Sequence, residues 1–149
     1  MGGPADLRMH PDPPLRLFTV PEANAFVPRL EQIFRRLDPK FARLRELKEL
    51  IEDAESYWGD GLAAAPENDR DAYVVALQEQ ADLERLVQAD IDEVLSLGCE
   101  LKDIQRGLVD FPARIGNEVA YLCWQRGEQG LGWWHTLDAG FAGRKALIP

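Results

Sequence analysis

The sequence predicts an α+β protein, with a long kinked antiparallel helical hairpin followed by a small antiparallel three-stranded β meander. Two long stretches carry apolar residues at intervals of three and four, the period of a helix. After Gly98 the interval becomes two, the period of a strand. We therefore expect a helical region over residues 15–98 and a β-module over residues 99–149. Residues 1–14 contain four prolines and predict a disordered tail.

The first helix has a clear start signal. Thr19 and Glu22 have the spacing of a capping box, and Pro21 falls in the first turn, where a missing N–H is harmless. Pro28 and Pro39 each predict a bend or a short break, because proline removes a backbone donor. One apolar face continues past both prolines, at Phe26, Leu30, Ile33, Leu37, Phe41, Leu44, Leu47, Ile51, Ala54 and Trp58.

The second helix begins after a loop that opens at Gly59. Asn68 or Asp69 is the expected cap, and Gly98 is the expected left-handed stop. At 1.5 Å per residue the two helices would be ~55 Å and ~45 Å long. One hairpin cannot bury such long apolar stripes on both sides, so we expect a homodimer. The apolar face of this helix comprises Tyr73, Ala76, Leu83, Leu86, Val87, Ile91, Val94 and Leu97.

Three strands are expected in the β-module, over residues 99–104, 107–114 and 118–125. Pro112 cannot donate to a ladder, so it predicts an edge position or a bulge. In the glycine-rich segment that follows, residues 133–138 are compatible with a short helical turn.

Composition and charge restrict the class of protein. Hydrophobic residues make up 46% and charged residues 29%, which is typical of a globular domain. The net charge of -9 lies in residues 1–97, with 20 acidic and 11 basic residues, whereas residues 98–149 have six of each. An acidic body repels phosphate backbones, so we expect no duplex nucleic acid as a partner. No bilayer-length apolar run or secretory signal is visible, and two cysteines are too few for a disulfide framework, so we expect a reduced, cytoplasmic protein.

Motifs along nearly the whole chain after residue 17 resemble a known family. They are Phe18-Thr19, Glu22-Ala23-Asn24, Leu101-Lys102-Asp103, Gly107 to Ala113, Tyr121-Leu122-Cys123-Trp124, Gly127-Glu128, Trp134-His135 and Gly140 to Arg144. The chain is similar in these to the bacterial domain-of-unknown-function family two-two-zero-three. The resemblance implies a small cytoplasmic protein with a helical N-terminal half, and it implies no activity.

One group of side chains has the chemistry for metal binding or acid–base catalysis. It joins His135 to Asp103, Asp110, Cys123, Glu128 and Asp138. A histidine with nearby carboxylates suffices for zinc, iron or manganese. The competing interpretation is structural, because a histidine beside a tryptophan is more often packed and hydrogen-bonded, and aspartate at a strand end usually orders a turn.

Three further features have both a functional and a structural interpretation. The run from Gly140 to Arg144 is compatible with an anion cradle, or with a turn in which Phe141 fills the core. Trp124, Trp133, Trp134, Phe111 and Tyr121 are compatible with a surface that stacks a nucleotide, or with the core of a small module. The hairpin tip is acidic and is either a solvated end or an arm that delivers carboxylates, at Glu52, Asp53, Glu55, Asp60, Glu67, Asp69 and Asp71.

The first functional hypothesis is a non-enzymatic homodimeric binding or interaction protein, without a cofactor or metal, whose partner could be another protein. Its ligand surface would comprise Asp103, Asp110, Trp134, His135 and Arg144. This hypothesis predicts that His135→Ala and Arg144→Ala abolish binding with little change in melting temperature.

Two alternatives remain open. One is a metal-dependent hydrolase-like enzyme with a divalent metal on His135, Asp138 and Asp110 and with Glu128 as general base. The other is an acidic-tipped coiled-coil factor that acts on RNA polymerase. This alternative rests only on an analogy of overall layout, an acidic-tipped helical hairpin followed by a small β domain.

Overall fold

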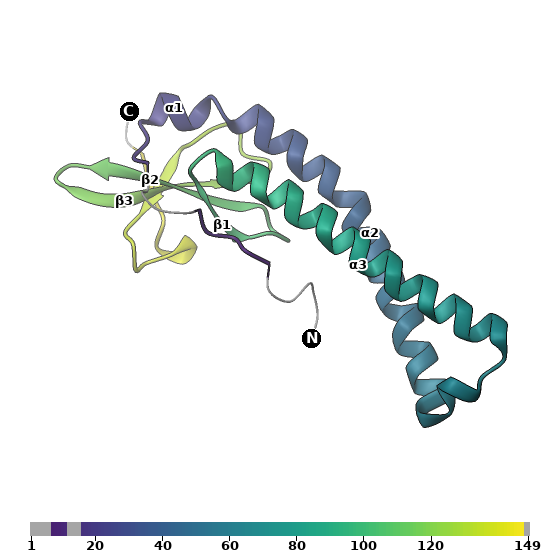
Figure 1. Cartoon of the computed structure of the whole chain (residues 1–149). Helices are drawn as coiled ribbons and strands as arrows, with labels where there is room; N and C mark the ends of the chain where they lie inside the picture. The colour runs from purple at the N-terminus through teal and green to yellow at the C-terminus, as the bar shows by residue number, and fades with distance from the viewer. Residues whose placement is uncertain (1–6, 12–15, 148–149) are drawn as a thin grey trace.

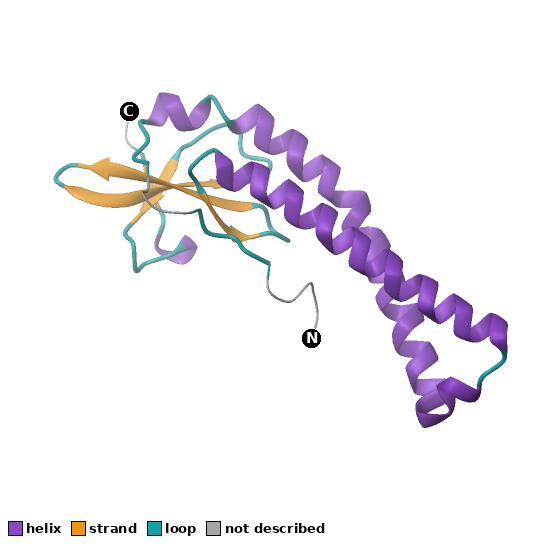
Figure 2. Cartoon of the chain, in the orientation of Figure 1, coloured by secondary structure: helices purple, strands orange, loops and turns teal. Residues whose placement is uncertain are grey.

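The computed structural model describes residues 7–11 and 16–147, and it confirms an α+β fold (Figure 1). Most of the predicted N-terminal tail lies outside the described residues. Two long helices form an antiparallel hairpin that extends well beyond the sheet, which gathers at one end of the molecule (Figure 2). The helical elements are α1 (Val20–Asn24), α2 (Val27–Trp58), the 3₁₀ turn η1 (Gly59–Ala64) and α3 (Glu67–Ser96).

The helix starts follow local chemistry. At α1 the Glu22 N–H donates to the Thr19 hydroxyl at 3.2 Å, and the Thr19 N–H donates to the Glu22 carboxylate at 2.8 Å, so the predicted capping box is present. The predicted first helix is interrupted between α1 and α2, and Pro28 lies in the first turn of α2. Pro39 lies inside α2 without ending it.

The second helix begins slightly earlier than its expected cap. Pro66 is the residue before α3, so Asn68 and Asp69 lie in the first turn. After α3, Gly98 has a φ of +97°, as expected for a left-handed stop. A Cβ there would lie 3.1 Å from the Phe18 ring, so close packing also favours glycine.

The hairpin has a proximal half that packs on the sheet and a distal half that packs on itself. The main core combines helix residues such as Phe34 and Ile91 with sheet residues such as Phe111 and Trp124. The distal half has a separate small cluster at Leu47, Ile51 and Ala76. Ion pairs also join the helices, at Arg36–Asp90, Arg36–Glu93, Lys40–Asp90 and Arg43–Glu79.

The sheet is a five-stranded antiparallel meander in the order β1-β2-β3-β4-β5. Its strands are β1 (Glu100–Asp103), β2 (Leu108–Ile115), β3 (Glu118–Gln125), β4 (Trp133–His135) and β5 (Lys145–Ala146). The meander therefore extends the three expected strands by two short ones. The helical turn suggested for residues 133–138 is wrong, because residues 133–135 pair with β3 in the ladder.

Side chains alternate between the two faces of this sheet. Val109, Phe111, Leu122 and Trp124 belong to the core beneath the helices. Their neighbours in sequence, among them Asp110 and Cys123, therefore lie on the other face, which we call the open face.

Two segments before α1 continue the sheet beyond β1. The Leu101 N–H donates to the Met9 carbonyl at 3.1 Å, and the Phe18 N–H donates to the Pro112 carbonyl at 2.7 Å. Registered pairs between β1 and β2 reach only Asp110, so Pro112 is locally at an edge, as predicted. In an antiparallel strand the backbone N and O atoms of one residue point to the same side. The Pro112 carbonyl points to Phe18, so the Pro112 nitrogen also points away from β3, and the β2–β3 ladder loses no donor.

No helix in the described part of the chain combines the length and the apolar character needed to cross a bilayer.

Candidate functional site

A buried aspartate–histidine pair lies on the open face. Asp110 comes from β2 and His135 from the end of β4, and Cys123 of β3 stands opposite Asp110 in the ladder. The side chains of Asp110 and His135 are 3% and 2% exposed, and the His135 Nε2 atom lies 3.0 Å from the Asp110 Oδ2 atom. Three neighbouring strands thus hold the pair in a fixed position.

The second imidazole nitrogen defines where the ring carries a proton. His135 Nδ1 lies 2.8 Å from the backbone carbonyl oxygen of Thr136. A carbonyl oxygen can only accept, so Nδ1 is the donor and Nε2 is directed at the Asp110 carboxyl. The Thr136 hydroxyl donates to Asp138 at 2.9 Å, which orders the same loop.

Burial sets the protonation of this cluster. It raises the pKa of Asp110 above the usual range, and the neighbouring His135 opposes this rise. Burial and the Asp110 carboxylate raise the pKa of the Cys123 thiol to about 12, so the thiol stays protonated at neutral pH and donates to Asp110. A Cys–His nucleophilic mechanism needs a thiolate or an imidazole bonded to the sulfur, but here the thiol is protonated and both His135 nitrogens are bonded to other groups.

The cluster opens into a pocket of about 240 Å³. Asp110, Cys123 and His135 contribute polar groups to its lining, and Leu108, Leu137 and Phe141 contribute apolar groups. The complete lining is Lys102, Asp103, Leu108, Asp110, Cys123, His135, Leu137, Gly140 and Phe141. Three of the predicted ligand residues, Asp103, Asp110 and His135, therefore meet at one pocket.

Arg144 lies behind this pocket and supports its wall. Its guanidinium donates two hydrogen bonds to the Glu128 carboxylate, each 3.0 Å long, and a third to the Cys123 carbonyl at 3.3 Å. The same guanidinium lies 4.5 Å from the Phe141 ring centroid and 4.8 Å from that of Trp133. Because Glu128 already neutralises Arg144, the arrangement argues against an anion cradle. The expected core position of Phe141 is wrong, because its half-buried ring lines the pocket and stacks on Arg144.

Other predicted residues lie away from the pocket or order its loops. Trp134 packs against the main core beneath the helices, so it faces away from its neighbour His135. Asp103 lines the pocket and also accepts two backbone N–H groups, from Gln105 and Arg106, at 3.0 Å each. Asp138 is exposed on the Thr136 loop.

The residues that can hold a metal ion differ in one member from the sequence-based set. The ligand atoms of Asp110, Cys123 and His135 all lie within 4.8 Å of one another, and all three residues are buried. Cys123 takes the place proposed for Asp138, because a strand neighbour is rigidly opposite Asp110 whereas Asp138 is bonded in its loop.

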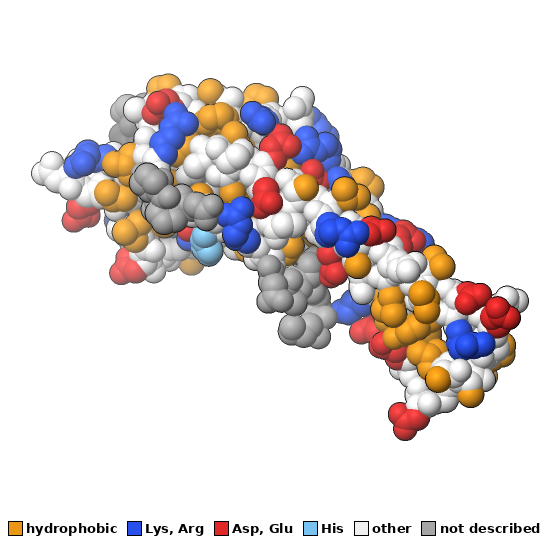
Figure 3. Space-filling model, viewed as in Figure 1, with side chains coloured by type: hydrophobic (Ala, Val, Ile, Leu, Met, Phe, Trp, Pro, Cys, Tyr) orange, Lys and Arg blue, Asp and Glu red, His pale blue; other side chains and the backbone are white. Residues whose placement is uncertain are grey.

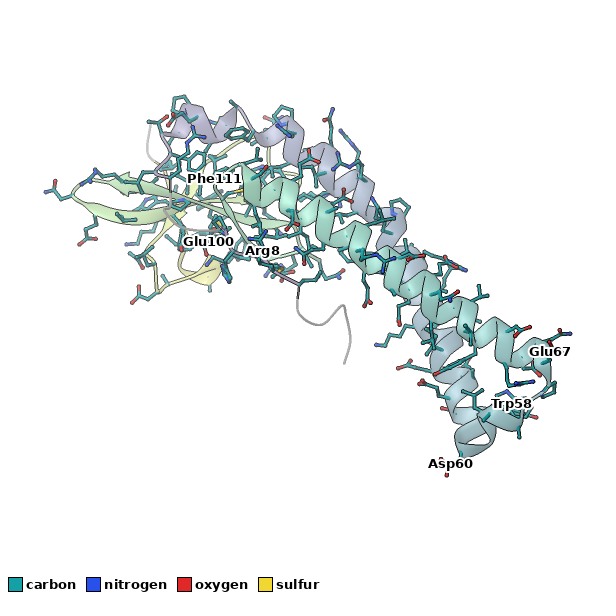
Figure 4. The ribbon with its side chains drawn as sticks, viewed as in Figure 1. Arg8, Trp58, Asp60, Glu67, Glu100 and Phe111 are labelled. Atoms are coloured by element: carbon teal, nitrogen blue, oxygen red, sulfur yellow. The ribbon has the colours of Figure 1, made fainter. Side chains whose placement is uncertain are left out.

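A second polar network on the open face centres on Glu100, which is 6% exposed and labelled in Figure 4. Its carboxylate accepts a hydrogen bond from Lys102 at 3.1 Å and one from the Tyr121 hydroxyl, and it lies 2.9 Å from His10 Nδ1. Burial alone would raise the pKa of Glu100, but the bonds from Tyr121, His10 and Lys102 outweigh it and hold the pKa below the usual range.

This second network adjoins the buried pair through Tyr121, whose ring centroid lies 5.4 Å from that of His135. Sequence reasoning did not select Glu100 or Lys102 as site residues, and it considered Tyr121 only as part of a stacking surface or of the core. A signal was available, because Glu100 and Lys102 are two residues apart on a predicted strand and so share a face.

The family model described as "Uncharacterized conserved protein (DUF2203)" matches residues 16–147. The chain belongs to this family. All residues of the pocket fall within the DUF2203 match, whereas His10 lies before it. No curated protein and no solved structure shows a significant match to the chain.

Proposed function

We propose that this DUF2203 protein is a non-enzymatic binding protein that holds a small ligand in the pocket over Asp110 and His135. The observation that carries the proposal is the combination of a 240 Å³ pocket with a buried carboxyl–imidazole pair in its lining. Binding sites for small molecules typically combine apolar walls with a few fixed polar groups. Leu108, Leu137 and Phe141 supply the apolar part here.

The pocket limits the size and the shape of the ligand. Its volume is below the roughly 300–1,000 Å³ of pockets that take drug-sized molecules. A molecule with one polar head group and a short branched apolar body matches the lining. The head group would lie at Asp110 and His135, and the body against Phe141.

The protonation of the cluster supports binding over nucleophilic catalysis. Both nitrogens of His135 have partners, and the Cys123 thiol is protonated at neutral pH. Glu128, the candidate general base, is bonded to Arg144 behind the pocket wall. These contacts favour a fixed recognition surface.

The binding test uses ¹⁵N-labelled full-length protein and three probes of one shape: isobutanol, isobutylamine and isobutyrate. We expect at least one probe to shift the amide signals of residues 108–110 and 135–141. Leu137→Arg should block the pocket mouth and remove these shifts, whereas Val119→Arg, at another exposed site, on β3 and outside the pocket lining, should leave them unchanged. If no probe shifts these signals, or if Leu137→Arg has no effect, the pocket is not a binding site.

We also propose that the hairpin pairs with a second copy of the chain. Large apolar side chains are exposed along it, including Tyr57 at 80% and Val75 at 58%. Figure 3 shows hydrophobic side chains gathered on the arm near its tip. In α2, residues 27–48 carry seven basic and three acidic side chains, whereas residues 49–58 carry four acidic and no basic ones. Four of those basic residues already pair with α3 carboxylates, namely Arg29, Arg36, Lys40 and Arg43, so the exposed apolar side chains carry this proposal.

A second candidate is the factor acting on RNA polymerase, and the acidic tip of a projecting arm favours it. Asp60 and Glu67 lie at the far end of the hairpin, near Trp58 (Figure 4). Co-purification with RNA polymerase that is lost when Asp60 and Glu67 become Ala would support this candidate. A dimer that covers the arm would argue against it.

A further inference from the structure

We propose that Asp110, Cys123 and His135 bind one divalent metal ion of the zinc class, with an open coordination position toward the pocket. This inference rests on the proposed function, because it names the group that would hold the polar head of the ligand. In the proposed centre the hydrogen bond between Asp110 and His135 gives way to three metal ligands on three adjacent strands, β2, β3 and β4.

The separations between the ligand atoms suit such a centre. Zinc binds nitrogen and oxygen at about 2.0–2.2 Å and sulfur at about 2.3 Å, so ligand atoms in a tetrahedral site are roughly 3.3–3.8 Å apart. The His135 Nε2 and Asp110 Oδ2 atoms are already 3.0 Å apart, and Cys123 Sγ lies within 4.8 Å of both. Metal binding would release the Cys123 thiol proton to solvent, and a rotation of the Cys123 side chain would bring the resulting thiolate into range.

The orientation of the imidazole also fits metal binding. Metal-bound histidines generally donate their other ring N–H to a carbonyl or carboxylate, which fixes the ring. His135 Nδ1 makes this bond to the Thr136 carbonyl at 2.8 Å, so the Nε2 atom of a neutral ring presents its lone pair to Asp110. Two acceptors that face each other need a cation between them, either a proton or a metal ion.

The third ligand favours the metal ion and indicates its kind. A set of one nitrogen, one oxygen and one sulfur atom suits zinc, cobalt or iron, and it is a poor site for magnesium or calcium. Lys102, the one lysine among the described residues of the pocket lining, donates a hydrogen bond to Glu100 at 3.1 Å. A cation at the centre would balance the Asp110 carboxylate directly.

The open position faces the pocket and gives the ligand a defined chemistry. Three protein ligands with a free fourth position is the arrangement of zinc sites that bind water or substrate. With the metal in place, we expect water or a carboxylate oxygen at the fourth position, and the apolar body of the ligand against Leu137 and Phe141.

Cobalt(II) provides the test, because a cobalt–thiolate bond has a near-ultraviolet charge-transfer band. Full-length protein treated with chelator and then dialysed is titrated with cobalt(II) alone at neutral pH. We expect one equivalent to bind, with the charge-transfer band and the visible bands of a tetrahedral ion. Cys123→Ser should remove the charge-transfer band. Cys99→Ser is the matched control, since Cys99 is equally buried but donates to the Val94 carbonyl, and it should retain the band.

Several results would overturn the metal site. They are the absence of cobalt binding at micromolar concentration, binding without the charge-transfer band, or a band that persists in Cys123→Ser. X-ray absorption of zinc-loaded wild-type protein provides a check without variants, and a first shell that lacks sulfur would also overturn the proposal. Repeating the titration with the isobutyl probes in chelator-treated protein separates the metal proposal from the pocket-ligand proposal. Probe binding without cobalt binding removes the metal alone, and cobalt binding without probe binding removes the pocket ligand alone.

Discussion

Replacement of Arg144 by Ala tests whether this residue recognises a ligand or supports the pocket wall. Arg144 is 13% exposed and makes two 3.0 Å hydrogen bonds to Glu128, which is 27% exposed. A ligand residue would leave the melting temperature unchanged on replacement, as the sequence-based hypothesis expects. Replacement of a supporting residue would leave the partly buried Glu128 carboxylate without its partner and would lower the melting temperature.

The size of the effect follows from these contacts. Breaking a buried ion pair by removal of one partner costs about 3–5 kcal/mol. Glu128 keeps some exposure and still accepts the Gln125 N–H at 2.7 Å, so we expect about 3 kcal/mol, the lower end of that range. For a domain of this size, 1 kcal/mol corresponds to roughly 2–4 °C, so the melting temperature should fall by roughly 6–12 °C.

The assay is urea unfolding followed by far-ultraviolet circular dichroism, together with a thermal melt. Arg114→Ala is the matched control, because Arg114 is exposed on β2, and it should change stability by less than about 0.5 kcal/mol. Glu128→Gln and the double variant complete a cycle that isolates the pair. A loss below about 1 kcal/mol for Arg144→Ala would refute the supporting role and return Arg144 to the ligand surface.

Three more predictions concern other parts of the molecule. Gly107→Ala should destabilise the fold by at least about 2 kcal/mol in urea unfolding, because φ is +70° and a Cβ would lie 2.5 Å from a side-chain carbon of Arg126. Gly116→Ala is the control, and it should cost only about 1–2 kcal/mol because its φ is +63° but its surroundings are open. Equal losses of stability in the two variants would contradict the steric argument. The pKa of Glu100 in the folded state lies below its ordinary value of 4.5, so its contribution to stability is present above pH 4.5 and is lost as pH falls through the folded pKa. In a plot of the urea midpoint against pH, Glu100→Gln should therefore reduce the slope on the acid side. An unchanged slope would contradict this role of Glu100. Val75→Glu should convert the proposed dimer to monomer in sedimentation equilibrium while Val119→Glu should not, and a wild-type monomer at high micromolar concentration would end the dimer proposal.

The sequence predicted those parts of the fold that depend on nearby residues. The capping box at Thr19 and Glu22 acts over three residues, and the stop at Gly98 depends on one backbone angle. The apolar spacing of the two helices identified most of the core residues that the helices contribute, because a 3.6-residue period is a local property. Local rules were therefore sufficient for the hairpin and the first three strands.

The missed features depend on contacts between distant segments. Residues 133–135 carry a Trp-Trp-His run that is short and weakly periodic, and only pairing with β3 makes it a strand. That pairing also decides which residues form the site, because it turns His135 toward Asp110 and Trp134 toward the helices. Arg144 and Glu128 are 16 residues apart, so no local pattern indicated their ion pair. The sequence indicated Asp110 and His135, which the fold brings together, but not the geometry that turns Arg144 toward Glu128.

The short segments that precede α1 have a consequence for association between chains. An uncovered strand edge offers unpaired N–H and C=O groups to other molecules and is a starting point for aggregation. Here Met9 accepts the Leu101 N–H and Phe18 donates to the Pro112 carbonyl, so the chain occupies its own edge at both places. The opposite edge is β5, which has only two residues. Without the Met9 segment (residues 7–11) the Leu101 N–H would be open to another chain, so this segment protects the sheet from self-association at that edge.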